Sequence, residues 1–221
     1  MKKKNIILTI IASLVAVIVL VVAIPFIVLG AKTASLSSDY AYLQNDSHYS
    51  TKVEVKDIKL VKQHVSCGYA TIEMMSTYYG SKVSEEDLDN RNKSISTSSS
   101  KGFLKEVNKS IPSQSFVMKR FLKGDELLKE IHTALTNNHP VAIEWAAKYE
   151  GEWTLHFSLV TALDIVTDSV KVNNPYGYIE NVTINEFLNR TSFKAYQNIP
   201  LFLNFGFAFG AFDKNTIFYA Q

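Results

Sequence analysis

The chain has one cysteine, Cys67, and its surroundings suit a nucleophilic thiol. Apolar residues at helical spacing predict a helix from Gly68 to Tyr79, and Ser66 can cap its start. A thiol at a helix N-terminus lies beside unpaired backbone N–H groups and the positive end of the helix dipole, and both favour the thiolate. The competing interpretation is a buried thiol that acts as a small apolar side chain, which is the commoner role of a free cysteine.

Two residues near Cys67 could assist attack on a carbonyl group. Gly68 would let the chain approach a substrate closely, directly after the nucleophile. Gln63 stands four residues before the cysteine, and its side-chain amide could join the backbone N–H of Cys67 around a developing oxyanion. A solvated turn residue explains Gln63 as well.

A thiol nucleophile needs a base, normally an imidazole that a third group holds in orientation. Of the five histidines, His156 opens a strand predicted from Phe157 to Leu163, just after the polar and aromatic segment that contains Trp153. His48 lies in a polar stretch, and His64 is too near the cysteine in sequence. His132 lies on a predicted helix, and His139 comes just after it. We therefore predict that His156 is the base. Trp153 either covers the His156 side of the cleft or is an exposed loop aromatic.

The turn after the next predicted strand offers the third group. Asn174 precedes Pro175 and Gly177, where the chain turns after a strand predicted from Ser169 to Asn173. If the two strands are antiparallel neighbours, Asn174 lies at the same end of the sheet as His156 and can hold the tautomer of its ring. An Asx turn before proline explains the asparagine about as well.

The first 30 residues predict a membrane segment. The run from Ile6 to Gly30 is apolar except at two positions, and as a helix it spans about 37 Å against about 30 Å of bilayer hydrocarbon. A cleavable signal peptide has an apolar core of only about 7–15 residues, so the length favours an uncleaved anchor. The lysines at positions 2–4 should stay in the cytoplasm, which places Ala31 onward outside it, and the domain is secreted if the segment is cleaved.

Composition excludes several classes of protein. With 9 Gly, 5 Pro and 1 Cys in 221 residues, the chain is not a collagen-like, disordered or disulfide-stapled polypeptide. Three of its 23 basic residues precede the apolar run, which leaves 20 against 21 acidic residues, so no basic footprint for nucleic acid is present. The sequence has neither a zinc-ligand spacing nor a phosphate-binding or dinucleotide fingerprint, and we expect no metal and no cofactor.

The order of predicted elements indicates an α+β fold. Residues 31–50 read as a polar stalk with little regular structure, and 51–221 as one domain. Predicted helices come first and predicted strands later in that domain. The helices are 68–79, one that opens at 84, one near 103–107, 125–137 and one that opens at 183, and the strands are 141–147, 157–163, 169–173 and 201–212.

Four segments together resemble C39-like cysteine peptidases, which have a papain-like fold. They are Val61–Met74 around Cys67, His139–Ile143, His156–Asp164 and Val172–Gly177, and the similarity runs from about Lys59 to Arg190. The resemblance implies a nucleophile helix packed on an antiparallel sheet, with Cys67, His156 and Asn174 as the triad. The family usually has Asp as the third residue, often has its glutamine further ahead of the cysteine, and has a small residue or proline in place of Tyr69.

The sequence therefore predicts a membrane-anchored, extracytoplasmic cysteine peptidase that acts on a peptide or protein substrate. One alternative keeps the chemistry but changes the substrate, as in peptidoglycan amidases and transglutaminase-like proteins, which use the same Cys-His-polar order. The other is a catalytically inactive papain-like module that only binds a peptide. The predicted partners are the substrate and, through residues 6–30, the membrane, with no nucleic acid.

Overall fold

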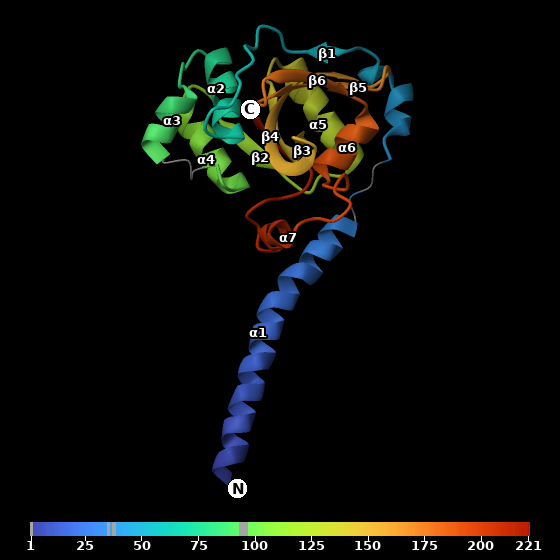
Figure 1. Cartoon of the computed structure of the whole chain (residues 1–221). Helices are drawn as coiled ribbons and strands as arrows, with labels where there is room; N and C mark the ends of the chain where they lie inside the picture. Colours follow the sequence, from blue (N-terminus) through green and yellow to red (C-terminus); the bar gives the residue numbers. More distant parts are fainter. Residues whose placement is uncertain (1, 35, 37–38, 93–96) are drawn as a thin grey trace.

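The computed structural model describes residues 2–34, 36, 39–92 and 97–221, which form a long N-terminal helix followed by a domain of helices and an antiparallel sheet (Figure 1). Met1 and positions 35 and 37–38 of the predicted stalk lie outside this description. The first helix, α1 (Lys2–Ala34), projects from one end of the domain. Its segment Ile6–Ala34 contains an 18-residue stretch with a mean hydropathy of 3.3 and is long and apolar enough to cross a membrane or to serve as a signal sequence.

Part of the predicted stalk folds onto the domain. Two short 3-10 helices, η1 (Ala41–Asn45) and η2 (Ser47–Tyr49), follow α1. Leu43 is fully buried in the main apolar core, and the hydroxyl of Tyr42 donates a hydrogen bond of 2.6 Å to Asp125. The expectation of little regular structure is therefore wrong for residues 41–49, because their apolar and tyrosine side chains find partners on the domain.

Helices precede most strands along the domain, as the α+β prediction requires. The elements after η2 are β1 (Val53–Glu54), α2 (Cys67–Tyr78), α3 (Glu85–Asn92), α4 (Ser100–Ser110), β2 (Phe116–Lys119), α5 (Gly124–Thr136), β3 (Val141–Tyr149), β4 (Glu152–Asp164), β5 (Ser169–Asn174), β6 (Tyr178–Val182), α6 (Ile184–Thr191), α7 (Leu201–Ala208) and β7 (Thr216–Ala220). The predicted fold class, a mixed fold with an antiparallel sheet after one long apolar helix, is confirmed.

The central strands of the sheet are buried on both faces. The strand order is β2-β7-β3-β4-β5-β6 with every pair antiparallel, and β1 pairs with the far end of β4. Val141, Ile143 and Trp145 of β3 face the core beneath α5 and α6, whereas Ala142 faces the core beneath α2 and α4. Alternate residues of a strand point to opposite faces, so a strand covered on both sides reads as a nearly continuous apolar run.

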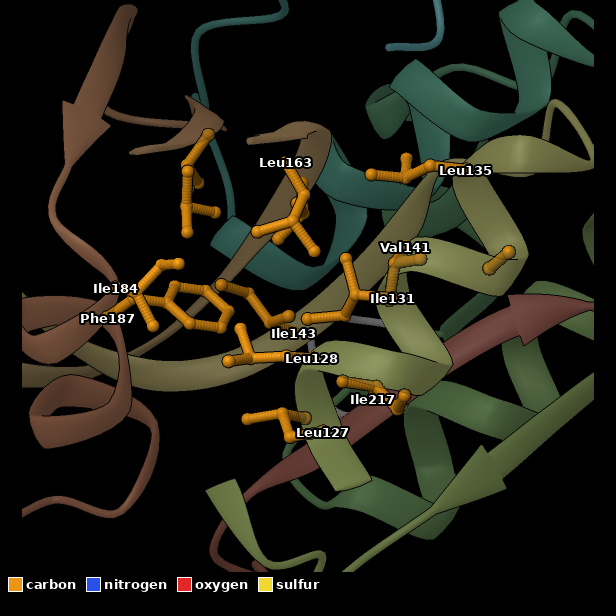
Figure 2. Close-up of a cluster of buried hydrophobic side chains, with 14 of the residues drawn as sticks. Leu127, Leu128, Ile131, Leu135, Val141, Ile143, Leu163, Ile184, Phe187 and Ile217 are labelled. Atoms are coloured by element: carbon orange, nitrogen blue, oxygen red, sulfur yellow. The ribbon is translucent and has the colours of Figure 1, made fainter. Parts of the chain in front are cut away.

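The core beneath α5 and α6 packs against the face of the sheet that lies away from α2. Figure 2 shows Leu127, Leu128 and Ile131 of α5 pointing toward the sheet, with Ile184 and Phe187 of α6 closing the cluster from the side. Burial of each such side chain stabilises the fold by about 1.5–3 kcal/mol. The helix α2 packs against β4, so the helix that begins at Cys67 is held next to the strand that carries His156.

The predicted strand over 201–212 is wrong, since these residues form the helix α7 and a turn. Leu203 and Phe207 are four residues apart and both pack into the domain. The alternation of large and small residues that suggested a strand comes instead from a helix that carries apolar side chains on more than one side. Gly206 is required by packing, because a Cβ there would lie 2.9 Å from the ring of Phe212.

Candidate active site

The loop before α2 delivers Cys67 to the first position of the helix. The Ser66 hydroxyl accepts a hydrogen bond of 3.2 Å from the backbone N–H of Tyr69, as expected of a helix cap. The buried carboxylate of Glu85 accepts from three consecutive backbone N–H groups, those of His64 (2.8 Å), Val65 (2.8 Å) and Ser66 (2.7 Å). Glu85 therefore clamps the backbone that leads into the cysteine.

His156 and Asn174 lie in contact at one end of the sheet. Nε2 of the His156 ring is 2.9 Å from Oδ1 of Asn174, and both residues are buried. The antiparallel pairing of β4 with β5 places Leu159 opposite Asn173, which brings the end of β5 to the level of His156. The antiparallel arrangement assumed from the sequence is thus present.

A tight hairpin presents the Asn174 amide. Gly177 has φ +99 and donates its N–H to the Asn174 carbonyl at 2.9 Å, so Pro175–Gly177 closes the three-residue loop between β5 and β6. Oδ1 of Asn174 also accepts from the N–H of Tyr176 at 2.9 Å. The Asx turn and the contact with His156 therefore occur together, and the same oxygen makes both.

The neighbours of Asn174 determine the tautomer of His156. A backbone N–H can only donate, so the amide atom that faces Tyr176 is the oxygen. On the other side, Nδ2 of Asn174 donates to the carboxylate of Glu180, which can only accept. Because Oδ1 cannot donate, Nε2 of His156 must carry the hydrogen. Nδ1 is then the unprotonated nitrogen, free to act as a base.

An ion pair supports this arrangement from behind. Glu180 forms a salt bridge of 2.6 Å with Arg190, whose side chain is only 4% exposed. The Arg190 Nε donates to the Ala146 carbonyl at 2.7 Å, and the guanidinium lies 3.4 Å from the ring centre of Trp145. Polar contacts therefore link four side chains in one continuous chain that holds the imidazole: His156, Asn174, Glu180 and Arg190.

The ring of Tyr176 lies over the imidazole. Its centroid is 4.1 Å from that of His156 with an angle of 25° between the planes, and its hydroxyl is 2.8 Å from Oγ1 of Thr154. Burial raises the pKa of Tyr176, the hydroxyl contact with Thr154 lowers it, and the charge of Cys67 raises it. Tyr176 therefore covers one face of the His156 ring.

Cys67 is partly exposed and has a thiol that resists ionisation. Desolvation of the sulfur raises its pKa to about 11, against the opposing effect of the backbone N–H groups of Phe157, Gly68 and Cys67 itself. The prediction of a lowered pKa at the helix N-terminus is thus outweighed by burial. The N–H of Phe157 belongs to the residue directly after His156, which places the sulfur beside the histidine strand.

His156 is also neutral. Burial lowers the pKa of its ring to about 4, although the hydrogen bond to Asn174 and the charge of Glu180 act to raise it. No hydrogen bond joins Cys67 to the His156 ring within the described residues. The resting site accordingly holds a neutral thiol and a neutral imidazole, and proton transfer between them would accompany the chemistry.

Comparison with known proteins places this geometry in a family. The model of the Peptidase C39 like family matches residues 55–200. The chain belongs to the Peptidase C39-like family. A solved structure of a double glycine motif protease from an AMS/PCAT transporter, in complex with the leader peptide, shares the fold with a TM-score of 0.50 and 14% identity, over 76% of this chain and 94% of that chain. No curated protein matches the sequence.

In this C39-like protein, Thr97 lies close against Gly68. A Cβ at position 68 would lie 2.5 Å from Cβ and Oγ1 of Thr97, and Gly68 is buried. The space at this glycine is therefore filled by Thr97, and the predicted contact of Gly68 with a substrate stays a prediction.

Gln63 lies at the Asn174 turn of the C39-like site. Its backbone N–H donates to the Pro175 carbonyl at 2.7 Å, so the loop before α2 and the hairpin after β5 are joined here. Its Oε1 atom is buried and has no hydrogen-bond partner. Gln63 is thus in the candidate site and not in a solvated turn, while its role at an oxyanion stays a prediction.

Trp153 does not cover His156. It is three residues before His156 on a regularly paired strand, so the two side chains point to opposite faces. Its ring lies 6.2 Å from that of Tyr196 and 4.9 Å from Nζ of Lys148. It also lines a pocket of about 580 Å³ with Glu180 and Arg190, which lies beyond the polar chain and does not include Cys67 or His156. A substrate role for Trp153 stays a prediction.

The sequence did not identify four residues of this C39-like site, namely Glu85, Tyr176, Glu180 and Arg190. A signal for Glu180 existed, since the Pro-x-Gly turn sets the hairpin register and puts Glu180 on the face of Asn174. Arg190 and Glu85 had no local signal. Among the described residues, no group of three or more His, Cys, Asp or Glu side chains could hold a metal ion.

Proposed function

We propose that this chain is a membrane-anchored, extracytoplasmic cysteine peptidase with Cys67, His156 and Asn174 as its triad. The observation that carries the proposal is the contact of 2.9 Å between His156 and an Asn174 amide of fixed orientation, beside the one cysteine of the chain. Membership of the Peptidase C39-like family supports it. The complex of the structurally similar protease with a leader peptide supports a peptide substrate.

The first half of the reaction forms a thioester. The Cys67 sulfur attacks the peptide carbonyl carbon while Nδ1 of His156 takes the thiol proton, so that a neutral pair reacts without prior ionisation. The negative oxygen of the tetrahedral intermediate accepts from the backbone N–H of Cys67 at the start of α2 and from the side-chain amide of Gln63. The C–N bond then breaks, and the proton on Nδ1 passes to the leaving amine.

The second half restores the enzyme. Water attacks the thioester carbonyl and gives a proton to Nδ1 of His156. The C–S bond breaks, the sulfur takes that proton, and the product leaves as a carboxylic acid. Asn174 holds the ring through Nε2 in both halves, and Glu180 holds Asn174.

The proposed placement of the domain is supported by α1 and by the lysines that precede its apolar run. The three lysines at positions 2–4 would remain in the cytoplasm, Ile6–Gly30 would span the bilayer, and the catalytic domain would lie outside. Residues 31–50 would link the two, with 41–49 packed on the domain, and 51–221 would form the peptidase domain.

A catalytically inactive peptide-binding module is the second candidate. The raised pKa of Cys67 favours it, because a thiol that is not ionised at neutral pH is a weaker nucleophile. In that case the site would hold a peptide without cleaving it.

The test compares the full chain in detergent with matched variants, using a peptide library and mass spectrometry of the products. We expect Cys67→Ala and His156→Ala to abolish cleavage, while His48→Ala, at an exposed histidine, retains it. Circular dichroism verifies that each variant is folded. Binding of peptides without cleavage by the wild type would favour the inactive module, and release of peptides from cell-wall fragments alone would favour an amidase.

A further inference from the structure

The helix α7 lies side by side with the end of α1 that leads into the domain (Figure 1). The rings of Phe26 in α1 and Phe205 in α7 meet edge to face with centroids 5.2 Å apart. Leu29 of α1 packs against the apolar cluster that contains Leu203 and Phe207 of α7. The two helices therefore form one continuous apolar surface at this end of the domain.

One side of α7 is buried and the other is uncovered. Phe207 packs into the domain with its ring 4.7 Å from that of Phe193. On the other side, large apolar side chains remain exposed: Leu201 by 70%, Phe202 by 72%, Phe205 by 38% and Phe209 by 55%. The segment 201–209 has no charged residue, and a contiguous apolar patch of this kind in water marks an interaction surface.

The depth of Phe26 along α1 indicates what covers the patch. About 20 helical residues cross the roughly 30 Å of bilayer hydrocarbon. Counted from Ile6, that length ends near Phe26. Phe26, and Phe205 beside it, would therefore lie where hydrocarbon meets the lipid headgroups, the level at which membrane proteins concentrate aromatic side chains.

Cationic side chains border the same surface. Nζ of Lys32 in α1 is 4.9 Å from the ring centre of Phe121. Arg120 lines a small pocket together with Lys32 and the exposed Phe209. Its side chain is 44% exposed and forms an ion pair of 3.1 Å with Asp213 in the same pocket, so two cationic side chains and one carboxylate lie beside the patch. Lys and Arg next to an apolar face match the anionic headgroups of a membrane surface.

We propose that α7 is an interfacial helix, which inserts Leu201, Phe202 and Phe205 into the outer leaflet of the bilayer. The inference rests on the membrane anchoring given under the proposed function. With α1 as the first attachment, α7 gives the domain a second one and fixes its orientation.

The single cysteine of the chain makes the experiment direct. A nitroxide label is placed in the Cys67→Ser chain at Phe202→Cys, at Ile18→Cys in α1, and at Lys56→Cys, next to β1 at the end of the domain away from α1 (Figure 1). Each full chain is reconstituted in vesicles of phosphatidylcholine and phosphatidylglycerol. The relaxation of each label by oxygen, which partitions into lipid, is compared with relaxation by a water-soluble nickel chelate.

We expect the label at 202 to be relaxed by oxygen and shielded from the chelate, and the label at 56 to behave in the opposite way. Equal access of the chelate to 202 and 56, with the label at 18 shielded, would overturn the insertion of α7 and leave the anchor intact. Access of the chelate to 18 as well would overturn the anchor and α7 together. Shielding at 202 that disappears on dilution with lipid would mean a second copy covers the patch, which also overturns the proposal.

Cleavage of soluble peptides by the same chain with Cys67 present is measured separately, so that failure of the peptidase function is not confused with failure of α7 to insert. As a second variant, Phe202→Asp is combined with a label at Phe209→Cys. We expect the charge to expose the label at 209 to the chelate at least severalfold more than in the chain without it. No change on introducing the charge would contradict insertion.

Discussion

Nε2 of His156 lies 2.9 Å from Oδ1 of Asn174, and this contact determines which nitrogen of the neutral ring carries the hydrogen. The oxygen already accepts from the N–H of Tyr176, and the amide nitrogen already donates to Glu180, so the amide cannot be reversed without breaking both. An asparagine thus fixes the tautomer here as an aspartate would. An aspartate at position 174 would carry a negative charge next to the imidazole. Here the negative charge lies on Glu180, the next side chain in the chain of polar contacts.

This arrangement predicts that the carboxylate of Glu180 can be moved to position 174 if an amide takes its place at position 180. Asn174→Asp alone sets two carboxylates against each other, and Glu180→Gln alone leaves the buried Arg190 without its nearest partner. We expect each single variant to lower kcat/KM by at least about tenfold, a loss of about 1.4 kcal/mol of transition-state stabilisation. The double variant conserves charge and should recover most of the activity.

The check on this exchange is a double-mutant cycle in kcat/KM together with thermal unfolding of all four chains. A coupling energy of about 0.5–3 kcal/mol is expected for groups in one network. Additive losses in the double variant would mean that Glu180 does not act through Asn174.

The pH profile of catalysis should extend to acid conditions. The imidazole must be neutral to accept a proton, and burial lowers its pKa to about 4, so kcat/KM should fall only near pH 4 and not near 6.5. Because the pKa in the folded state is below that of the unfolded chain, the associated stability is fully present above the unfolded pKa and is lost as the pH falls through about 4. A loss of kcat/KM already near pH 6.5 would contradict the burial of this ring.

The thiol should react slowly with alkylating agents in the absence of substrate. Desolvation raises the pKa of Cys67 to about 11, so the rate of reaction with iodoacetamide should continue to rise with pH well above 8. Mass spectrometry of the single modified site measures that rate. A fast, pH-independent reaction near neutrality would show that the thiolate is formed there, and that the helix N-terminus and His156 outweigh burial.

Glu144 should make the protein less stable as the pH rises. Its carboxyl group is buried beside Ser100, whose hydroxyl donates to it at 2.7 Å, and burial raises the pKa to about 8. A raised folded pKa means that stability is full below the unfolded pKa of about 4.5 and is lost as the pH increases through about 8. Glu144→Gln should therefore raise Tm at pH 8 and leave it nearly unchanged at pH 5.

Calorimetry of the two chains across this range is the measurement, and Glu86→Gln, at an exposed carboxylate of α3, is the matched control. Equal shifts in Tm for the two variants would argue against a special role of the buried group.

The damage caused by replacing Gly68 should be reversed by a smaller residue at position 97, on the other side of the contact. Gly68→Ala places a Cβ 2.5 Å from Thr97, which must move and should displace the start of α2. We expect a destabilisation of about 1–3 kcal/mol, typical of overpacking, with a loss of activity because Cys67 is adjacent. Gly68→Ala combined with Thr97→Gly should regain both, as measured by denaturant unfolding and peptide cleavage. Failure of the second substitution to help would mean that Gly68 meets the substrate directly.

Removal of the Tyr176 ring should expose the imidazole. Tyr176→Phe keeps the ring over His156 and loses only the contact with Thr154, whereas Tyr176→Ala opens the ring to water. We expect the alanine variant alone to move the acid limb of kcat/KM toward pH 6.5, because solvation favours the charged imidazole. An equal shift in both variants would assign the effect to the hydroxyl group.

The local sequence predicted those elements whose formation depends only on residues close to them in sequence. The start of α2 follows from the Ser66 cap, and the hairpin that presents Asn174 follows from proline and glycine at fixed positions, because capping and turn chemistry act within four residues. The same reasoning predicted α5, whose apolar side chains recur at helical spacing. It failed for α7, since a helix with apolar residues on several sides has no clear period.

The sequence by itself therefore determined the helix that begins at Cys67, the strand of His156, the turn at Asn174 and the apolar N-terminal helix. Only the tertiary structure decided that Tyr176 and not Trp153 lies over His156, that Glu180 and Arg190 stand behind Asn174, and that α7 lies beside α1. It also decided the ionisation of Cys67, for which burial outweighs the helix N-terminus. The physical reason is that capping and turn geometry act between near neighbours, whereas desolvation and ion pairing depend on residues far apart in sequence that only the packed sheet brings together.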